Sequence, residues 1–595
     1  MSTAILTGQP VPGSSIEGDL RSLGFDVRVA ADAADAETLL AQVPGDQRVA
    51  VVDARFVGHL HALRLGLTDP RFPLSAIPGT VTAQAAGRQA LTRAMARENS
   101  AGGGTAVAVD SLADRMVTAL DADGADVHRP ELGSLVAAVP ADPQARNEAR
   151  QAVANVDDEA VRLKSAVKSR DGFFTTFCIS PYSRYLARWC ARRGLTPNQV
   201  TTASLLTALI AAGCAATGTR VGFVAAGILL ICSFVLDCTD GQLARYSLQY
   251  STLGAWLDAT FDRAKEYAYY AGLALGAARG GDDVWALALG AMILQTCRHV
   301  VDFSFNEANH DATANTSPTA ALSDKLDSVG WTVWVRRMIV LPIGERWAMI
   351  ALLTAVTTPR ITFYVLLIGC AFAATYTTAG RVLRSLTRRA RRTDRAAQAL
   401  ADLADNGPLA SLVAGATRAR LGAPLLVAAA GTAVLAVSLF SGVTWAPVAG
   451  AVVYTLAAGQ ALYRPLKGAL DWLVPPLFRF AEYGTVLVLA AKADVNGALP
   501  AAFGLVGAVA YHHYDTVYRI RGNAGAPPAW LVRAIGGHDG RTLLVTVLAA
   551  VLTASQFKVA LTALAVAVAL LVLVESIRFW VSAGAPAVHD EGEPA

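Results

Sequence analysis

The chain has little cysteine, little charge and no lysine in its first quarter. Its seven cysteines lack the spacing of a zinc site, so we expect reduced thiols and no disulfides. Charged residues make up 16% of the chain, the net charge is +4, and no basic patch is interleaved with aromatic residues, which argues against nucleic-acid binding. The amino terminus has no basic segment followed by an apolar stretch, so we expect no signal peptide.

Apolar sequence is abundant instead: 53% of the residues are hydrophobic, and the excess is concentrated after residue 198. Segments of membrane-spanning length recur between residues 199 and 580 and predict about twelve transmembrane helices. Basic clusters such as Arg184–Arg193 and Arg381–Arg392 alternate with weakly charged turns. This pattern predicts a multi-pass protein of the plasma membrane whose termini are both cytoplasmic. The Ala/Arg-rich, Lys-poor composition is typical of a bacterial protein.

The first 145 residues have the pattern of a doubly wound α/β domain, because short apolar strands alternate with helical stretches. The expected strands are Ala4–Leu6, Val27–Ala30, Val49–Val52, Ala106–Val109 and Leu135–Val139. A charged linker helix and an interfacial amphipathic helix should follow. The whole predicted division is 1–145 α/β, 146–197 linker and interfacial helix, 198–390 first membrane domain, 391–420 cytoplasmic linker, 421–582 second membrane module, and 583–595 disordered tail.

Two pairs of aspartates in apolar sequence form the most informative motif. Asp237 and Asp240 are three residues apart, and Asp258 and Asp262 are four apart. On helices that turn about 100° per residue, each pair falls on one face, so two helices can direct their carboxylates to one point. An ionised carboxylate in a membrane helix needs a partner or water. The nearby basic residues, which do not obviously neutralise the set, are Arg245, Arg263 and Lys265.

Carboxylate ligands without histidine or cysteine suit a hard divalent cation, Mg²⁺, Mn²⁺ or Ca²⁺. Gly241, Ala244 and Gly254 leave space beside the acids, and Arg245 has the planar fork that binds a phosphate. The combination predicts a diphosphate site. The alternative is that the acids cap helix ends and pair with the neighbouring basic residues.

The spacing Asp-x2-Asp-Gly-x2-Ala-Arg-x8-Gly-x3-Asp-x3-Asp resembles the signature of the CDP-alcohol phosphatidyltransferase family at every position. The resemblance implies a six-helix membrane enzyme that moves a phosphatidyl or similar phosphoalcohol group from a CDP-linked donor, such as CDP-diacylglycerol, to an acceptor hydroxyl, with release of CMP. A homodimer is also implied. About six further transmembrane helices would follow this core.

The resemblance also implies roles for individual residues. Asp237, Asp240 and Asp258 would hold two ions of Mg²⁺ or Mn²⁺, and Asp262 would lie near the metal and act as general base. The residues implied to contact the CDP moiety are Asp240, Gly241, Ala244, Arg245 and Gly254. Leu195-Thr-Pro-Asn-Gln-Val-Thr resembles the start of the family's first membrane helix, with Asn198 and Thr201 as nucleotide contacts or, alternatively, simple helix caps.

The acceptor would be bound by basic groups at a similar membrane depth. The candidates are Arg298, Arg336, Arg337 and Arg381, although the positive-inside rule explains most of these arginines equally well. The acceptor is expected to be a small polar alcohol or alcohol phosphate.

The flanking parts carry weaker signals. The position of the α/β domain resembles that of the cytidylyltransferase in bifunctional enzymes of inositol phosphate metabolism, but its first loop has no basic residue, so we expect a degenerate, non-catalytic domain. The second module resembles an uncharacterised module found behind such transferases. Ionisable residues on its predicted cytoplasmic side suggest a second site or, alternatively, helix caps and headgroup contacts: Asp471, Glu482, His512 and Asp515.

The sequence therefore predicts a metal-dependent transferase of phospholipid or inositol-phospholipid synthesis. Two other classes remain open. One is a synthase that uses CDP-inositol to make soluble or lipid inositol phosphodiesters, and the other is a non-catalytic membrane scaffold.

Overall fold

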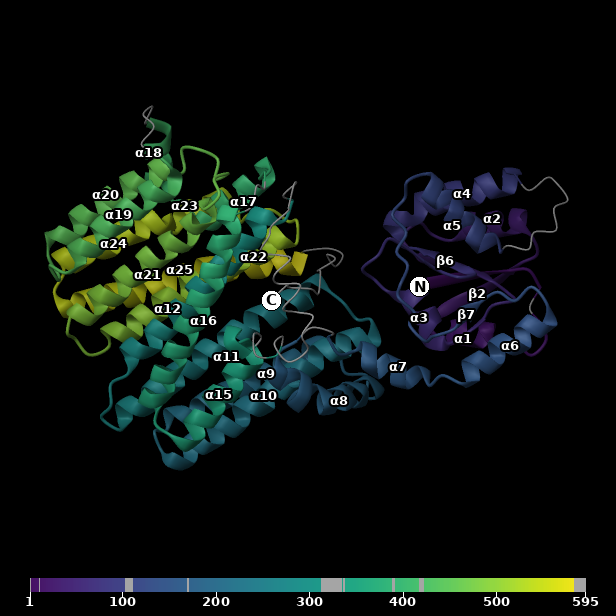
Figure 1. Ribbon diagram of the computed structural model, residues 1–595, viewed down its shortest axis with the longest axis horizontal. Helices are drawn as coiled ribbons and strands as arrows, with labels where there is room; N and C mark the ends of the chain where they lie inside the picture. The colour runs from purple at the N-terminus through teal and green to yellow at the C-terminus, as the bar shows by residue number, and fades with distance from the viewer. Residues whose placement is uncertain are drawn as a thin grey trace.

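The computed structural model describes residues 2–9, 11–101, 111–168, 171–311, 334, 338–387, 391–416 and 422–582. A mixed α/β unit at the amino end lies beside a larger helical body (Figure 1). Helices α6 (Pro143–Ala154) and α7 (Asp158–Ser165) connect the two. The predicted fold class, an α/β domain followed by a polytopic helical part, is therefore confirmed.

Among the described residues, the amino-terminal sheet has five strands in the order β2-β1-β3-β6-β5. β1 (Ser2–Thr7) is parallel to both β2 (Phe25–Ala30) and β3 (Arg48–Asp53). β6 (Thr80–Ala83) is antiparallel to both β3 and β5 (Leu74–Ile77). The sheet is thus mixed.

Helices cover both faces of this sheet, as a doubly wound pattern requires (Figure 1). One face packs against α1 (Ile16–Ser22) and α3 (Leu60–Thr68), and the other against α2 (Ala33–Gln42), α4 (Arg88–Ala101) and α5 (Leu112–Ala122). The residues of β1 and β3 are buried on both faces after the first residue of each strand, which explains their apolar sequence, whereas the edge strand β2 is partly exposed.

Four of the five expected strands lie among the described residues. Three correspond to β1, β2 and β3, and the fourth contains β7 (Ala137–Ala138), which pairs with β4 (Val57–Gly58) outside the main sheet. The expected strand Ala106–Val109 lies outside the described residues. The hairpin of β5 and β6 was not predicted, because its strands are only four residues long and are buried on both faces.

The charged linker forms two helices where one was expected. The break lies at 155–157, where Asp157 caps α7 by accepting from the backbone N of Glu159 and Ala160. The interfacial segment is helical as predicted: α8 (Ser180–Arg192) leaves Tyr182 and Trp189 exposed.

The first group of helices in the body begins at Pro197, where Thr196 and Gln199 form a capping box. These helices are α9 (Pro197–Ala216), α10 (Arg220–Ser247), α11 (Thr252–Arg279), α12 (Trp285–Asn309), α15 (Ile343–Val356) and α16 (Pro359–Thr387). Small residues allow close approach: Gly272 and Gly276 of α11 lie against the α9 backbone at Ala212 and Ala215. Both α10 and α11 pack on α9.

The second group of helices shares its core with the first. Its elements are α17 (Asp394–Ala404), α18 (Pro408–Ala416), α19 (Pro424–Leu439), α20 (Trp445–Ala461), η3 (Asp471–Leu473), α21 (Val474–Lys492), α22 (Ala498–Arg521), α23 (Ala529–Ala534), α24 (Gly537–Val551) and α25 (Ala554–Ser582). One continuous cluster of buried apolar side chains runs from α9 to α25. Within it, the ring of Trp285 in α12 meets Phe503 of α22 edge-on, with 5.6 Å between centroids.

Among the described residues, five helices are long and apolar enough to cross a membrane: α9, α10, α16, the segment Asp471–Lys492 and α25. The protein is a multi-pass membrane protein. The twelve crossings stay a prediction. α11 is also long, but the charged residues near its start, from Asp258 to Glu266, reduce its apolar character.

The contact between α9 and α11 gives the first testable prediction. A side chain at Gly276 would overlap the carbonyl oxygen of Ala215, whereas at Gly290 of α12 the nearest atom to an added Cβ is 3.9 Å away. We expect Gly276→Val to destabilise the protein by about 1–3 kcal/mol through overpacking. Its thermal unfolding midpoint in detergent should fall clearly below that of the matched Gly290→Val variant, and equal midpoints would contradict this packing.

Candidate active site

A tight turn joins the two helices that carry the aspartates. α10 ends at Ser247, Leu248 adopts a left-handed conformation with φ of 53°, and the backbone N of Gln249 donates to Ala244 O at 3.0 Å. The Ser251 side chain then caps α11 by accepting from Gly254 N at 2.9 Å. The turn reverses the chain, so both helices can pack on α9 with their acidic faces toward one point.

Three of the four predicted carboxylates meet there. One oxygen each from Asp237, Asp240 and Asp258 lie within 4.8 Å of one another. Asp240 is only 3% exposed, and its Oδ2 has no hydrogen-bond partner among the described residues. A buried carboxylate oxygen without a partner is costly, and a set of oxygen donors suits a hard divalent cation. These residues therefore fit one ion of the Mg²⁺ or Mn²⁺ type.

The fourth carboxylate, Asp262, is held by a lysine. Lys265 Nζ lies 2.9 Å from Asp262 Oδ1 and also contacts the Asp237 carboxylate. It donates to Ser204 Oγ of α9 at 3.2 Å, and the side chain of Lys265 has no exposed surface. Asp262 thus belongs to the same site, but it reaches Asp237 through an ammonium group. The binding of two metal ions stays a prediction.

The predicted nucleotide contacts surround the acids. A Cβ added at Gly254 would lie 2.8 Å from Asn198 Oδ1, so these two residues, far apart in sequence, are neighbours. Thr201 Oγ1 donates to Pro197 O at 3.0 Å, within its own helix. The closeness of Asn198 to Gly254 brings the start of α9 to the helix that carries Asp258, and the roles of Asn198 and Thr201 as nucleotide contacts stay a prediction.

The remaining predicted nucleotide contacts lie along α10. Gly241, Ala244 and Arg245 belong to its last two turns. The Arg245 guanidinium is 3.5 Å from the position that a Cβ on Gly241 would take, and Arg245 Nε donates to Ala166 O at 2.6 Å. The backbone of the linker thereby fixes this arginine beside the small residues.

A second buried ion pair supports α11 and was not predicted. Glu266 accepts from Arg346 of α15 through both carboxylate oxygens, at 2.9 and 3.1 Å. Tyr270 OH and Arg263 Nη1 also donate to Glu266, at 2.6 and 3.3 Å. A two-point arginine contact fixes both distance and orientation, so α15 holds α11 one turn beyond Asp262.

The amino-terminal unit touches the turn between the carboxylate helices. Arg162 of α7 donates from Nε to Tyr246 O at 2.8 Å, and Arg71 lies over the Tyr250 ring at 3.9 Å. Burial and the nearby Arg64 lower the pKa of Arg162 to about 10. The α/β unit thus contacts the turn whose geometry sets the spacing of the acids.

The model of the CDP-alcohol phosphatidyltransferase family matches residues 194–376. This segment is a CDP-alcohol phosphatidyltransferase domain. It runs from the loop before α9 into α16 and contains the whole acidic site. A second model, that of a family of unknown function named DUF5941, matches residues 394–595.

Curated relatives resemble part of the chain in sequence. The chain is 33% identical over 130 residues to a phosphatidylinositol phosphate synthase of Streptomyces avermitilis, which is 21% of this chain and 51% of the relative. It is 36% identical over 122 residues to the protein of that name in Mycolicibacterium smegmatis, covering 20% and 53%. It is 32% identical over 114 residues to a bifunctional IPC transferase and DIPP synthase of Aquifex aeolicus, covering 19% and 26%.

The chain thus spans about half the length of the two synthases and about a quarter of the bifunctional relative. The bifunctional relatives agree with the predicted nucleotidyltransferase-like character of the amino-terminal domain.

The candidate acceptor residues of the transferase domain lie on α12 and α16. Arg381 forms an ion pair with Asp302. Arg298 is 7% exposed and interacts electrostatically with both of these residues. Arg298 donates to Val340 O, while its Nε and Nη1 are buried without a hydrogen-bond partner among the described residues. Arg336 and Arg337 lie outside the described residues.

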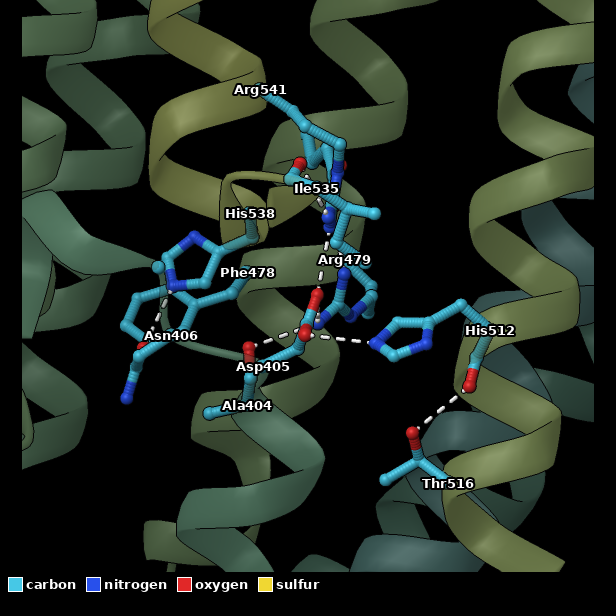
Figure 2. Close-up of polar contacts among 12 residues, drawn as sticks. Ala404, Asp405, Asn406, Phe478, Arg479, His512, Thr516, Ile535, His538 and Arg541 are labelled. Atoms are coloured by element: carbon cyan, nitrogen blue, oxygen red, sulfur yellow. Dashed lines mark hydrogen bonds and ion pairs between the residues drawn. The ribbon is translucent and has the colours of Figure 1, made fainter. Parts of the chain in front are cut away.

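The second module contains a buried polar network centred on Asp405, just after α17 (Figure 2). Asp405 Oδ1 pairs with His512 Nε2 at 3.0 Å, and its Oδ2 pairs with Arg541 Nη2 at 2.8 Å and Arg479 Nη2 at 3.1 Å. Both arginines also pair with Glu482. Two acids balance two arginines, and none of these side chains is more than 5% exposed.

The four predicted second-site residues therefore separate into three places. Glu482 and His512 belong to the Asp405 network. Asp515 accepts from Ser576 and Trp580, both at 2.6 Å, and Asp471 caps its own loop by accepting from Gly468 N at 2.7 Å. The sequence did not reveal Asp405, because this residue lies in a polar stretch with the composition of a linker.

The Asp405 network gives the second prediction. Asp405→Asn removes one of two buried acids and leaves Arg479 and Arg541 with Glu482 alone, so we expect a loss of about 3–5 kcal/mol in stability. The measurement is thermal unfolding in detergent. Asp394→Asn is the matched control, because Asp394 pairs with Lys467 at a side chain that is 94% exposed, where about 0–1 kcal/mol is expected. Similar midpoints for both variants would show that the network contributes little.

Proposed function

We propose that this protein is a divalent-cation-dependent CDP-alcohol phosphatidyltransferase of phospholipid synthesis. It would move a phosphatidyl or related phosphoalcohol group from a CDP-linked donor to an acceptor hydroxyl. The observation that carries the proposal is the meeting of Asp237, Asp240 and Asp258, with an unpartnered buried oxygen on Asp240. A scaffold that keeps the motif as a metal-bound structural element would share this point, and the release of CMP separates it from the enzyme.

In this proposal, the three aspartates would hold the cation, and the chemistry that it would supply there is neutralisation of charge on the diphosphate of the donor. Asn198 and Gly254 form one wall of the nucleotide site, where a glycine leaves room for the ligand against the backbone. Gly241 and Ala244 leave similar room along α10. Arg245 is held beside them by Ala166 O and is positioned to bind phosphate.

Asp262 acts as the general base. It takes the proton of the acceptor hydroxyl while that oxygen attacks the phosphorus that bears the alcohol group. The new phosphorus–oxygen bond replaces the bond to CMP, and CMP leaves with the electron pair. Lys265 and α9 hold Asp262 in place for this step, which is the positioning that acid–base catalysis requires.

We propose a phosphorylated inositol as the acceptor. The names of the Streptomyces and Mycolicibacterium relatives support this choice. Arg298 and Arg381, gathered near Asp302, supply the basic groups that an acceptor phosphate needs. The same acceptor class is compatible with a CDP-inositol donor, the choice that the bifunctional relatives favour.

We also propose a location and a role for the flanking parts. The exposed aromatic side chains of α8 would lie at the cytoplasmic surface of the plasma membrane, next to the active site. The α/β domain would be non-catalytic and would brace the turn at Tyr246 and Tyr250. A homodimer is expected on family grounds.

The decisive assay measures CMP release by the purified protein from CDP-diacylglycerol with Mg²⁺ or Mn²⁺. Inositol phosphate, glycerol phosphate, inositol and serine are the acceptors. We expect release with inositol phosphate and a lipid-soluble product, and removal of the divalent ion with EDTA should stop it. A water-soluble product made from CDP-inositol would instead identify the CDP-inositol synthase. No release with any pair, together with no binding of CDP-diacylglycerol, would favour the scaffold.

Two substitutions separate the roles of the acids. Asp262→Asn should lower turnover by at least about 100-fold, the usual contribution of a general base, while Mn²⁺ and donor binding stay measurable. Asp237→Asn should weaken Mn²⁺ binding itself. The control is Asp282→Asn, which changes an acid just beyond the other end of α11 that pairs with Arg360. Turnover at the wild-type rate in Asp262→Asn would refute its assignment as the base.

A further inference from the structure

We propose that the ammonium group of Lys265 takes the place of a second cation, so that the site holds a single divalent ion. This inference deepens the proposed function and rests on it for the identity of the metal site. It differs from the two-ion site that the family resemblance implies, and the reason is one side chain of this chain.

Lys265 reaches the site because of its place on α11. It follows Asp262 by three residues, so both side chains lie on the same face of the helix. Its Nζ lies between Asp262 and the Asp237 carboxylate on the neighbouring α10. A second ion shared by these two carboxylates would have to occupy that same place.

The ammonium group has polar partners on three sides. It donates hydrogen bonds to Asp237 and to Ser204 Oγ at 3.2 Å, and it forms an ion pair with Asp262 at 2.9 Å. The Trp347 ring lies 5.3 Å from Nζ and adds a favourable contact between a cation and an aromatic face. The surroundings of Lys265 Nζ therefore stabilise a positive charge at this position.

Neither burial nor the neighbouring acid Glu266 favours movement of the Lys265 ammonium group away from Asp237 and Asp262. Its side chain is entirely buried, and moving a bare ammonium into apolar surroundings is strongly unfavourable. The neighbouring acid on α11, Glu266, is already bound by Arg346, Arg263 and Tyr270. Lys265 therefore stays with Asp237 and Asp262, and its charge repels a divalent ion at their meeting point.

The other side of the cluster remains available to an ion. Lys265 is not among the hydrogen-bond partners of Asp240 or Asp258, and Asp240 Oδ2 is buried without a hydrogen-bond partner among the described residues. Asp237 is shared: its carboxylate contacts Lys265, and it also lies within the group of three donors. A divalent cation would thus lie among Asp237, Asp240 and Asp258, while the ammonium group of Lys265 lies between Asp237 and Asp262.

The test is the number of Mn²⁺ ions bound per chain. The full-length protein in detergent is titrated with Mn²⁺ in the presence of CDP, and free Mn²⁺ is followed by its electron paramagnetic resonance signal. We expect one ion per chain in the wild type and two in Lys265→Met, because the substitution frees Asp237 and Asp262. Two ions in the wild type would overturn the proposal, and so would one ion in Lys265→Met.

Three comparisons make the titration specific. Lys558→Met removes an equal charge from a lysine outside the site, whose Nζ donates to Asn496 O at 3.2 Å, and this variant should bind one ion. Lys265→Arg keeps a positive charge and should also bind one. Should Lys265→Met not fold, Lys265→Gln provides the neutral variant. Two Mn²⁺ ions per wild-type chain would by themselves decide against the proposal.

This outcome is separable from that of the proposed function. A count of one ion that rises to two in Lys265→Met supports the role of the lysine even if no CMP is released with any acceptor. Conversely, metal-dependent CMP release with two ions in the wild type would support the transferase and reject the role of Lys265.

Discussion

The site depends on the burial of charge among packed helices. Asp240, Lys265, Glu266 and Arg346 are each no more than 3% exposed. At such depth an unpaired charge is far more costly than at a surface, so every charged group must have a partner or a ligand. The helices meet much of this requirement by ion pairs across α10, α11 and α15, while Asp240 Oδ2 has no hydrogen-bond partner among the described residues. The close contact of α11 with α9, which Gly272 and Gly276 permit, brings the charges near enough to pair.

Much of this site could be predicted from the sequence because its spacing is local. Asp237 and Asp240 share a helix face by their separation alone, and the same holds for Asp258 and Asp262. The pairings between helices could not be predicted in this way. Arg346 lies 80 residues after Glu266, and Asp405 lies 136 residues before Arg541. Helical periodicity places Lys265 on the same face of α11 as Asp262. Whether its ammonium group contacts solvent or Asp237 of α10 depends on how the two helices pack, which periodicity does not predict.

The fold shows the same division. The strands β1, β2 and β3 were predicted because each forms a distinct apolar run, and the helical body because of its long apolar segments. The hairpin of β5 and β6 escaped prediction because both strands are four residues long and buried on both sides. The linker was expected as one helix, and the cap formed by Asp157 divides it into two. Short elements are decided by such local hydrogen bonds more than by periodicity.

The shared core has a consequence for the independence of the two membrane parts. On the side of α11 and α12 that faces the second module, His299 Nδ1 bonds with Tyr514 OH at 2.6 Å, and Arg263 lies over the same tyrosine ring at 5.2 Å. Tyr514 belongs to α22, so the second module covers a histidine and an arginine of the transferase domain. Removal of that module would leave both side chains without this contact, so the transferase domain has a polar surface that only a folded neighbour completes.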